Sequence, residues 1–223
     1  MTLLEVACFN VQSAIVANEA GADRIELCDN ADLGGTTPPL KWLDEIHGIV
    51  KIPINVMIRP RGGDFVYTDP EFQIMKDAIN AFKSTKMVSG FVFGVLRHNR
   101  TVDVERTVEL VRLADPLPCT FHRAFDETTD LDQAFEDVLG CGIHSILTSG
   151  GASKAVHACE TLARLVKKAD GRVVVMPGGG VRSTNIGALK ESTNASAYHS
   201  SALLGSNMVA NAQEIEQMEM EVR

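Results

Sequence analysis

The chain has 223 residues, of which 45% are hydrophobic and 22% are charged, and its formal net charge is −8. This length suits one domain with a complete hydrophobic core, so we expect residues 1–223 to form a single domain. The acidic balance disfavours nucleic acid as a partner, because proteins that bind it usually present a basic face.

The first residues, MTLLEVACFN, contain no basic segment followed by an apolar run. No stretch reaches the roughly 18 apolar residues that a membrane span requires. Five cysteines without a close CxxC pair are typical of a reducing compartment rather than of a disulfide framework. We therefore expect a cytoplasmic protein that has no membrane partner.

Eight short apolar runs recur along the chain at intervals of about 20 to 40 residues, the spacing of strand–helix–strand units. The predicted strands are Leu4–Cys8, Arg24–Cys28, Ile54–Arg59, Phe91–Leu96, Cys119–His122, Ser145–Ser149, Arg172–Met176 and Ala197–His199. Between them, helix starts are predicted at Thr37, Asp69 and Asp130. After the last strand, one apolar stripe predicts a closing helix, formed by Ile215, Met218 and Val222.

Eight such units in about 220 residues favour a single (β/α)₈ TIM-type barrel of the α/β class. An open doubly wound sheet is the alternative, because periodicity does not reveal closure. That fold would place a glycine-rich dinucleotide fingerprint after the first strand, where this sequence has Phe9, Asn10 and Val11.

Polar side chains gather where the predicted strands end, and active sites of TIM barrels lie at the carboxyl ends of the strands. Candidate proton donors and acceptors are Glu26, His122 and His199. The same acids and histidines could instead hold a hard divalent metal. Candidate substrate-binding residues are Glu5, Arg59, Arg61, Arg123 and Ser149.

The alternation of side chains along a strand predicts which candidates face the barrel axis. The apolar neighbours of Glu26 should face the helices, which leaves Glu26 and Cys28 facing inward. In the first strand, the same rule directs Glu5 and Ala7 inward and Cys8 outward.

Some candidates also have a purely structural interpretation. His122 and His199 could be hydrogen-bonded core histidines, and Glu26 with Arg59 could form an internal ion pair that neutralises two buried charges. No lysine ends a predicted strand, and neither a Gly-x-Ser-x-Gly nor an HExxH motif occurs. These features disfavour Schiff-base aldolases, hydrolases with a serine elbow and zincins.

Three glycines, Gly178, Gly179 and Gly180, follow the seventh strand and lead into a helix predicted to start at Ser183. In TIM barrels, such a turn before a helix N-terminus presents free N–H groups to an anion, often a phosphate. We therefore expect a small anionic ligand here. The alternative is that the glycines only make a tight turn.

Seven stretches, in order along nearly the whole chain, resemble the copper homeostasis family CutC. They are GADRIELC (21–28), GGTTPP (34–39), MIRPRGGDF (57–65), TFHRAFD (120–126), ILTSG (146–150), VMPGGGV (175–181) and HSSA (199–202). The resemblance implies a TIM-type barrel, a cytosolic location, a homo-oligomer and a link to copper through cysteines near the barrel mouth.

The resemblance places the copper ligands in the first two strands. Cys28 matches one of these cysteines directly. Many members have the other cysteine at the position of Ala7, whereas the thiol of this chain lies one residue later, at Cys8. Two thiolates suffice for Cu(I), which is a soft ion. The alternative is that both cysteines are small buried hydrophobes.

Two functions from different classes follow. The first is a cytosolic copper homeostasis protein that binds Cu(I) through Cys28, with Cys8 or another soft donor. The second is an enzyme that acts by acid–base chemistry on a small anionic or phosphorylated molecule. Copper binding requires the thiols but not the polar residues at the strand ends. Catalysis requires those polar residues but not the thiols.

Overall fold

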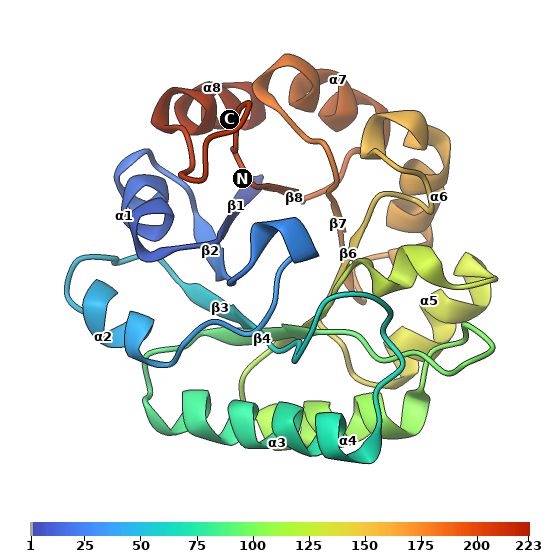
Figure 1. Cartoon of the computed structure of the whole chain (residues 1–223). Coiled ribbons are helices and arrows are strands. Elements are labelled where there is room, and N and C mark those ends of the chain that lie inside the picture. The colour runs from blue at the N-terminus through green and yellow to red at the C-terminus, as the bar shows by residue number, and fades with distance from the viewer. Residues whose placement is uncertain (1) are drawn as a thin grey trace.

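The computed structural model describes residues 2–223 as a ring of parallel strands enclosed by helices (Figure 1). All eight predicted strands are confirmed, each within three residues of its predicted ends. They are β1 (Leu3–Cys8), β2 (Arg24–Leu27), β3 (Ile54–Met57), β4 (Gly90–Phe93), β5 (Cys119–Phe121), β6 (Ser145–Thr148), β7 (Val174–Pro177) and β8 (Ala197–Ser200).

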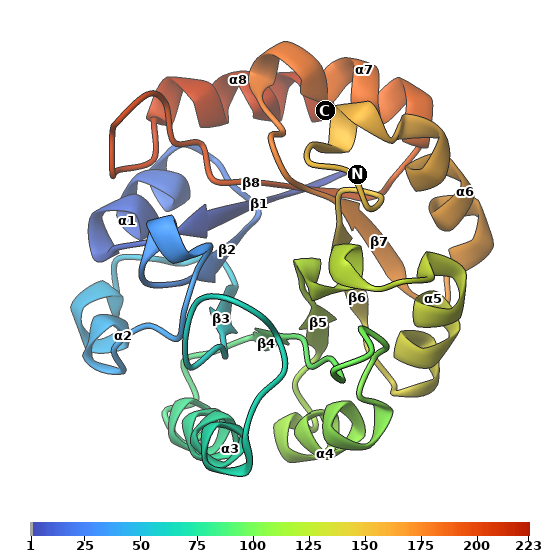
Figure 2. The same cartoon turned by 45° about the vertical axis from the view of Figure 1, so that its right-hand side comes forward.

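The strands pair in the order β7-β6-β5-β4-β3-β2-β1-β8. Figure 2 shows β8 beside β1, so the first and last strands are neighbours. β7 and β8 are also in contact, which closes the ring. The (β/α)₈ TIM-type barrel is therefore confirmed, and the open-sheet alternative is wrong.

Helices cover the outside of the barrel in chain order. They are α1 (Val11–Glu19), α2 (Lys41–Ile46), α3 (Asp69–Ser84), α4 (Val104–Ala114), α5 (Leu131–Gly140), α6 (Cys159–Ala169), α7 (Ser183–Thr193) and α8 (Ala212–Val222). Three short 3₁₀ helices lie in loops after strands, at Ala31–Leu33, Arg123–Glu127 and Ala155–His157. The closing helix is confirmed, and its predicted apolar stripe is buried.

Two of the three predicted helix starts differ in the structure. The N-cap of α3 is Thr68 rather than Asp69, because the Thr68 hydroxyl and the Glu71 carboxylate form a reciprocal capping box. The helix predicted at Thr37 begins only at Lys41, since Thr37 binds the backbone of Arg59 across the neighbouring loop. The predicted N-cap at Asp130 is confirmed, and its carboxylate accepts two amide hydrogens.

The core has two parts, and the predicted alternation in the first two strands is confirmed. Leu4, Val6 and Cys8 point outward into the large core between strands and helices. Inside the barrel, small apolar clusters fill the space below the mouth; one contains Cys28, Met57 and Val92, and the other Leu147, Met176 and Ala197. The polar residues of β1 and β2 therefore share the barrel interior with only a little apolar packing.

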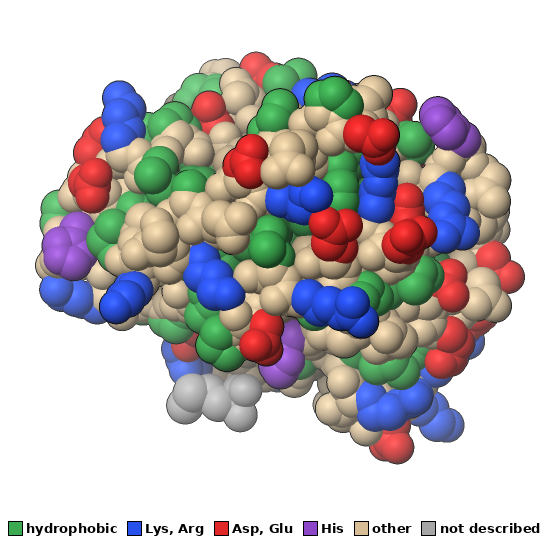
Figure 3. Space-filling model, turned by 90° about the horizontal axis from the view of Figure 1, so that it is seen from below, with side chains coloured by type: hydrophobic (Ala, Val, Ile, Leu, Met, Phe, Trp, Pro, Cys, Tyr) green, Lys and Arg blue, Asp and Glu red, His purple; other side chains and the backbone are tan. Residues whose placement is uncertain are grey.

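The flank formed by α3 and α4 carries both signs of charge, and Figure 3 shows basic and acidic side chains interspersed over this face. Lys76 pairs with Glu109 and Arg106 with Asp69 across the two helices. No helix within residues 2–223 is long and apolar enough to cross a membrane.

Candidate functional site

A cavity of about 190 Å³ opens at the carboxyl ends of the strands. The structure brings seven of the predicted site residues together in its lining, namely Glu26, Arg59, His122, Arg123, His199, Gly179 and Gly180. Glu5, Ser149 and Gly178 lie behind this lining and contact it. Arg61 lies elsewhere, on the outer side of its loop, where it pairs with Glu71 and Asp64.

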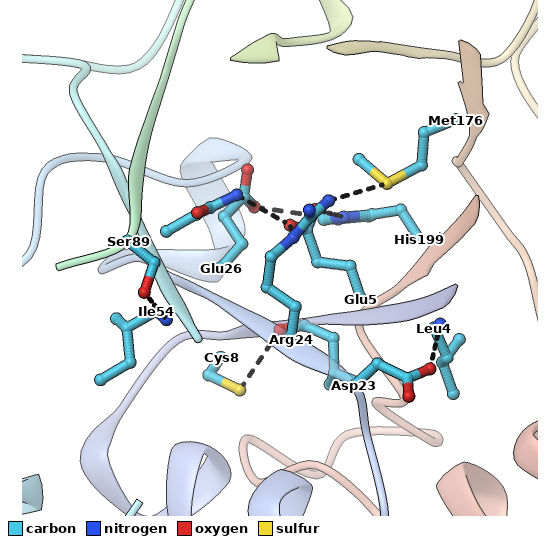
Figure 4. A network of polar contacts seen from close by, with 12 residues as sticks. Leu4, Glu5, Cys8, Asp23, Arg24, Glu26, Ile54, Ser89, Met176 and His199 are labelled. Atoms are coloured by element: carbon cyan, nitrogen blue, oxygen red, sulfur yellow. Dashed lines mark hydrogen bonds and ion pairs between the residues drawn. The ribbon is translucent and has the colours of Figure 1, made fainter. Parts of the chain in front are cut away.

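The floor of the cavity is a chain of buried ionisable groups from β1, β2 and β8. His199 Nδ1 lies 2.8 Å from Glu5 Oε1, and His199 Nε2 lies 3.8 Å from Glu26 Oε2. On the other side, Arg24 Nε donates to Glu5 Oε2 over 2.5 Å, with Asn55 Nδ2 at 3.3 Å. Figure 4 shows Glu5, Glu26 and His199 directed toward one another. One imidazole therefore bridges two carboxyl groups.

The two glutamates differ in their tendency to ionise. Burial raises the pKa of Glu5, but the hydrogen bond from His199 and the Arg24 guanidinium outweigh it and hold the pKa at about 2. For Glu26, burial raises the pKa and the nearby His199 offsets this only in part. For His199, burial lowers the pKa, but Glu26 and Glu5 outweigh it, so the pKa is raised. Glu5 is thus ionised at neutral pH, whereas Glu26 holds a proton more readily than an ordinary glutamate does.

Glu26 lines the cavity, and one of its two carboxyl oxygens has no partner within residues 2–223. Its Oε2 accepts a hydrogen bond from the Cys28 thiol over 3.2 Å. Its Oε1 is buried and has no hydrogen-bond partner among the residues that the structure describes. A buried carboxyl oxygen without a partner is costly unless a ligand or water satisfies it. This oxygen can therefore accept or deliver a proton to a bound molecule.

His122 lines the same cavity and has a ring N–H group without a partner among those residues. The amide of Ala124 donates to His122 Nδ1 over 3.1 Å, which leaves the ring proton on Nε2. His122 Nε2 is buried and has no partner in the described part of the chain. Burial and the nearby Arg59 lower the pKa of His122 to about 3. At neutral pH this side chain is therefore a hydrogen-bond donor that carries no charge.

Arg59 joins the loop after β2 to the loop after β3 and does not pair with Glu26. Its guanidinium donates to the carbonyls of Leu33, Gly35 and Gly63 over 2.7 to 2.9 Å and lies over the Phe65 ring. Ion pairs within residues 2–223 join Glu26 to His199 and not to Arg59. The internal Glu26–Arg59 pair is therefore wrong, because backbone carbonyls bind both Nη atoms of the guanidinium.

A second polar network holds Arg123 at the cavity wall. Arg123 donates to Asp126 Oδ2 and to Ser149 Oγ, each over 2.9 Å. Asp126, only slightly exposed, also accepts the Thr148 hydroxyl and the amides of Ser149 and Gly151. Sequence reasoning missed Asp126, although its place three residues after Arg123 in TFHRAFD was a usable signal.

The glycine turn is tightly enclosed. A Cβ at Gly178 would lie 2.4 Å from Leu147 Cδ1, and one at Gly179 would lie 3.1 Å from Arg123 Cζ. The amides of Gly179 and Gly180 find no acceptor within the described residues, and both glycines line the cavity. Glycine is therefore required here, both for space and because Gly179 has φ of +92°.

The N-terminus of α7 is not free, in contrast to the sequence prediction. The buried Glu214 of α8 accepts the Ser183 amide over 2.8 Å and the Ser183 hydroxyl over 2.7 Å. An internal carboxylate thus occupies the position that the helix dipole would offer to a ligand. Next to it, Arg182 lines the cavity, and sequence reasoning missed both Arg182 and Glu214.

The two strand-end thiols do not face one another. Cys28 packs inside the barrel, whereas Cys8 belongs to the large core between strands and helices. In Figure 4, the Cys8 thiol points away from Glu5, Glu26 and His199. Burial and the charge of Glu26 raise the pKa of both thiols well above their usual range. In the described residues, no group of three or more His, Cys, Asp or Glu side chains is placed to hold a metal ion. A two-thiolate Cu(I) site at Cys8 and Cys28 stays a prediction, which the placement of the two side chains in different clusters does not support.

Fold and site together define a TIM-type barrel with a small polar cavity at the carboxyl ends of its strands. The sequence model of the CutC family matches residues 2–204. The chain belongs to the CutC family. It is 44% identical over 200 residues to the copper homeostasis protein cutC homolog of Homo sapiens, which covers 90% of this chain and 73% of the relative.

Other relatives agree with this assignment. A CutC family protein of Chromobacterium violaceum is 43% identical over 90% of this chain and 81% of its own length. The crystal structure of a copper homeostasis protein CutC from Streptococcus agalactiae superimposes with a TM-score of 0.84 at 32% identity, covering 90% of this chain and 99% of that one. Phosphoribosyl anthranilate isomerase of Thermococcus kodakaraensis, with a TM-score of 0.67 at 16% identity over 100% of this chain and 99% of that one, shares the fold.

Proposed function

We propose that the protein contributes to copper homeostasis, and that its working part is the barrel mouth, which binds a small anionic molecule and moves a proton on it. The names of its relatives support the first half of this proposal. The second half rests on one observation: Glu26 and His122, each with a buried polar atom that has no partner among the described residues, line one cavity together with three arginines. Perturbed acid–base groups in a concave site are typical of catalytic centres.

The charge around the cavity favours an anion. Arg59, Arg123 and Arg182 line it, and Glu26 is the acidic side chain of the lining. The free amides of the glycine turn lie beside Arg123, so one anionic group can accept from backbone and guanidinium donors together. Because Glu214 fills the end of α7, we place the anion at Gly179 and Gly180 rather than at the helix.

We expect glycerol 3-phosphate to bind the wild-type protein, and Gly179→Ala to weaken this binding at least tenfold. The added methyl group would displace Arg123 and narrow the anion position. Isothermal titration calorimetry at low salt measures both affinities. The matched control is Gly171→Ala, a glycine with φ of +74° and open space around its Cβ position. Equal affinities in both variants, or no binding by the wild type, would contradict the proposal.

Direct Cu(I) binding is a second candidate function, favoured by the packing of two sulfur atoms. Cys28 and Met57 belong to one cluster inside the barrel, and Met57 also lines the cavity. A thiolate and a thioether are both soft donors of the kind that Cu(I) prefers. Copper would have to displace the thiol proton, which burial and Glu26 hold firmly.

An anaerobic Cu(I) titration against a competing chelator separates the two thiols. If this candidate function holds, Cys28→Ser and Met57→Leu each weaken Cu(I) binding, whereas Cys8→Ser leaves it unchanged because Cys8 faces the helices. Identical affinities in the wild type and Cys28→Ser would rule out the barrel site.

We also propose a cytosolic location, which the five free thiols support.

Self-association remains a prediction from the family resemblance. Light scattering coupled to size-exclusion chromatography tests it directly.

A further inference from the structure

Two residues of the cavity, Glu26 and His122, can act as a base and as a hydrogen-bond donor, and binding an anion requires neither property. The unpartnered Glu26 oxygen can take a proton, and the His122 Nε2–H can donate a hydrogen bond while the ring is neutral. Both side chains are more than nine-tenths buried, and both line the cavity. A neutral donor and a buried base in one water-poor space suit a reaction in which a carbonyl oxygen gains negative charge while a neighbouring carbon loses a proton.

The size of the cavity restricts the molecule. Its volume of about 190 Å³ is roughly six times the share of one water molecule in the liquid, which is enough for a few carbons and one phosphate. One end is formed by the glycine turn and Arg123, and the reacting groups lie elsewhere in the lining. A molecule with an anionic end and a carbonyl end would satisfy both sets of groups.

We propose that the cavity enolises a small phosphorylated α-hydroxy carbonyl compound, with Glu26 as the base and His122 as the hydrogen-bond donor to the carbonyl oxygen. This inference rests on the proposed anion site and names the substrate class for it.

The step balances without a further reactant. Glu26 Oε1 takes the proton from the carbon beside the carbonyl, and the electrons of that C–H bond form a carbon–carbon double bond. The carbonyl π electrons move to oxygen, where His122 Nε2–H stabilises the enediolate. Glu26 then returns a proton to the same carbon. When the proton on Glu26 exchanges with solvent before it returns, the carbon acquires a solvent hydrogen. Because burial raises the pKa of Glu26, its carboxylate is a stronger base than an exposed one.

His199 and Glu5 act as positioning residues in this scheme. His199 lies between the two carboxyl groups, and Glu5 is fixed in turn by Arg24 and Asn55. Cys28 and His199 both contact Oε2 of Glu26, so Oε1 is left without a partner in the described part of the chain. The orientation of the base is therefore set before a substrate arrives.

The first test compares two phosphate compounds in calorimetry. Phosphoglycolohydroxamate mimics the enediolate, whereas glycerol 3-phosphate has no carbonyl group. We expect the wild type to bind the hydroxamate at least 30-fold more tightly, as transition-state mimics do. In His122→Gln this ratio should fall below about threefold, whereas in the exposed control His144→Gln it should stay unchanged. Circular dichroism melting establishes that each variant is folded.

The second test follows deuterium exchange into dihydroxyacetone phosphate in D₂O by proton NMR. Wild type should remove the C–H signal, Glu26→Gln should slow this at least 100-fold, and the surface control Glu160→Gln should match the wild type. Both results are required. Glycerol 3-phosphate binding without hydroxamate preference or without exchange overturns the enolisation and leaves the anion site standing. Failure of both phosphate compounds to bind overturns the anion site as well.

Discussion

Replacing Glu5 with glutamine is expected to lower the free energy of unfolding by about 3 to 5 kcal/mol at pH 7. The Glu5 side chain is fully buried, and it carries the ion pairs to Arg24 and His199. Without the negative charge of Glu5, the Arg24 guanidinium would lose the carboxylate with which it pairs inside the barrel, and His199 would lose its nearest acid. A pKa of about 2 instead of the ordinary 4.5 corresponds by itself to about 3 kcal/mol.

The effect has a defined pH dependence. Since the folded-state pKa of Glu5 is depressed, its contribution is fully present above pH 4.5 and is lost as the pH falls toward 2. The pKa of His199 is raised, so the contribution of His199 is present below pH 6.5 and is lost as the pH rises through its folded-state value. The stability difference between wild type and Glu5→Gln should therefore shrink on acidification.

Urea unfolding at pH 7, 4.5 and 2.5 measures this difference. Glu71→Gln is the matched control, because hydrogen bonds from Arg61 and Thr68 also hold the pKa of Glu71 at about 2, but at the surface. Solvent screening makes such exposed pairs weak, so the control should lose far less stability. Similar losses in both variants would contradict the prediction, because they would show that burial does not increase the contribution of Glu5 to the free energy of unfolding.

Replacing Asp126 with asparagine should lower the free energy of unfolding by about 2 to 4 kcal/mol. In wild type, the carboxylate accepts from the Thr148 hydroxyl, two backbone amides and Arg123. An amide side chain has only one accepting oxygen, and its NH₂ group would face donors. Arg123 would also lose its anchor, so the affinity for glycerol 3-phosphate should fall at least tenfold.

Both losses can be measured on one preparation, by urea unfolding and by calorimetry. The control is Asp132→Asn, which removes a surface carboxylate paired with Arg164 and Lys168. It should affect neither property strongly, because its partners are solvated. Unchanged phosphate affinity in Asp126→Asn would mean that Arg123 needs no positioning.

Much of the site could be predicted because it depends on local rules. Side chains alternate along a strand, so the inward direction of Glu26 and the outward direction of Cys8 followed from their neighbours alone. The carboxyl ends of all parallel strands lie at the same end of a barrel, so His122 and His199 were both expected at that end. The residues after strands were harder, because Arg59 and Arg61 lie on a loop whose path is not periodic.

The barrel, its eight strands and the faces on which their polar residues lie could be predicted from the amino-acid sequence, since they follow from residue spacing over a few positions. The pairing of the polar side chains depends on the folded chain as a whole. Glu26 faces His199 instead of Arg59, and Glu214 fills the helix end that a ligand could have used. Such partners come from segments far apart in the chain, and their choice depends on strand register and loop path, which no local pattern encodes.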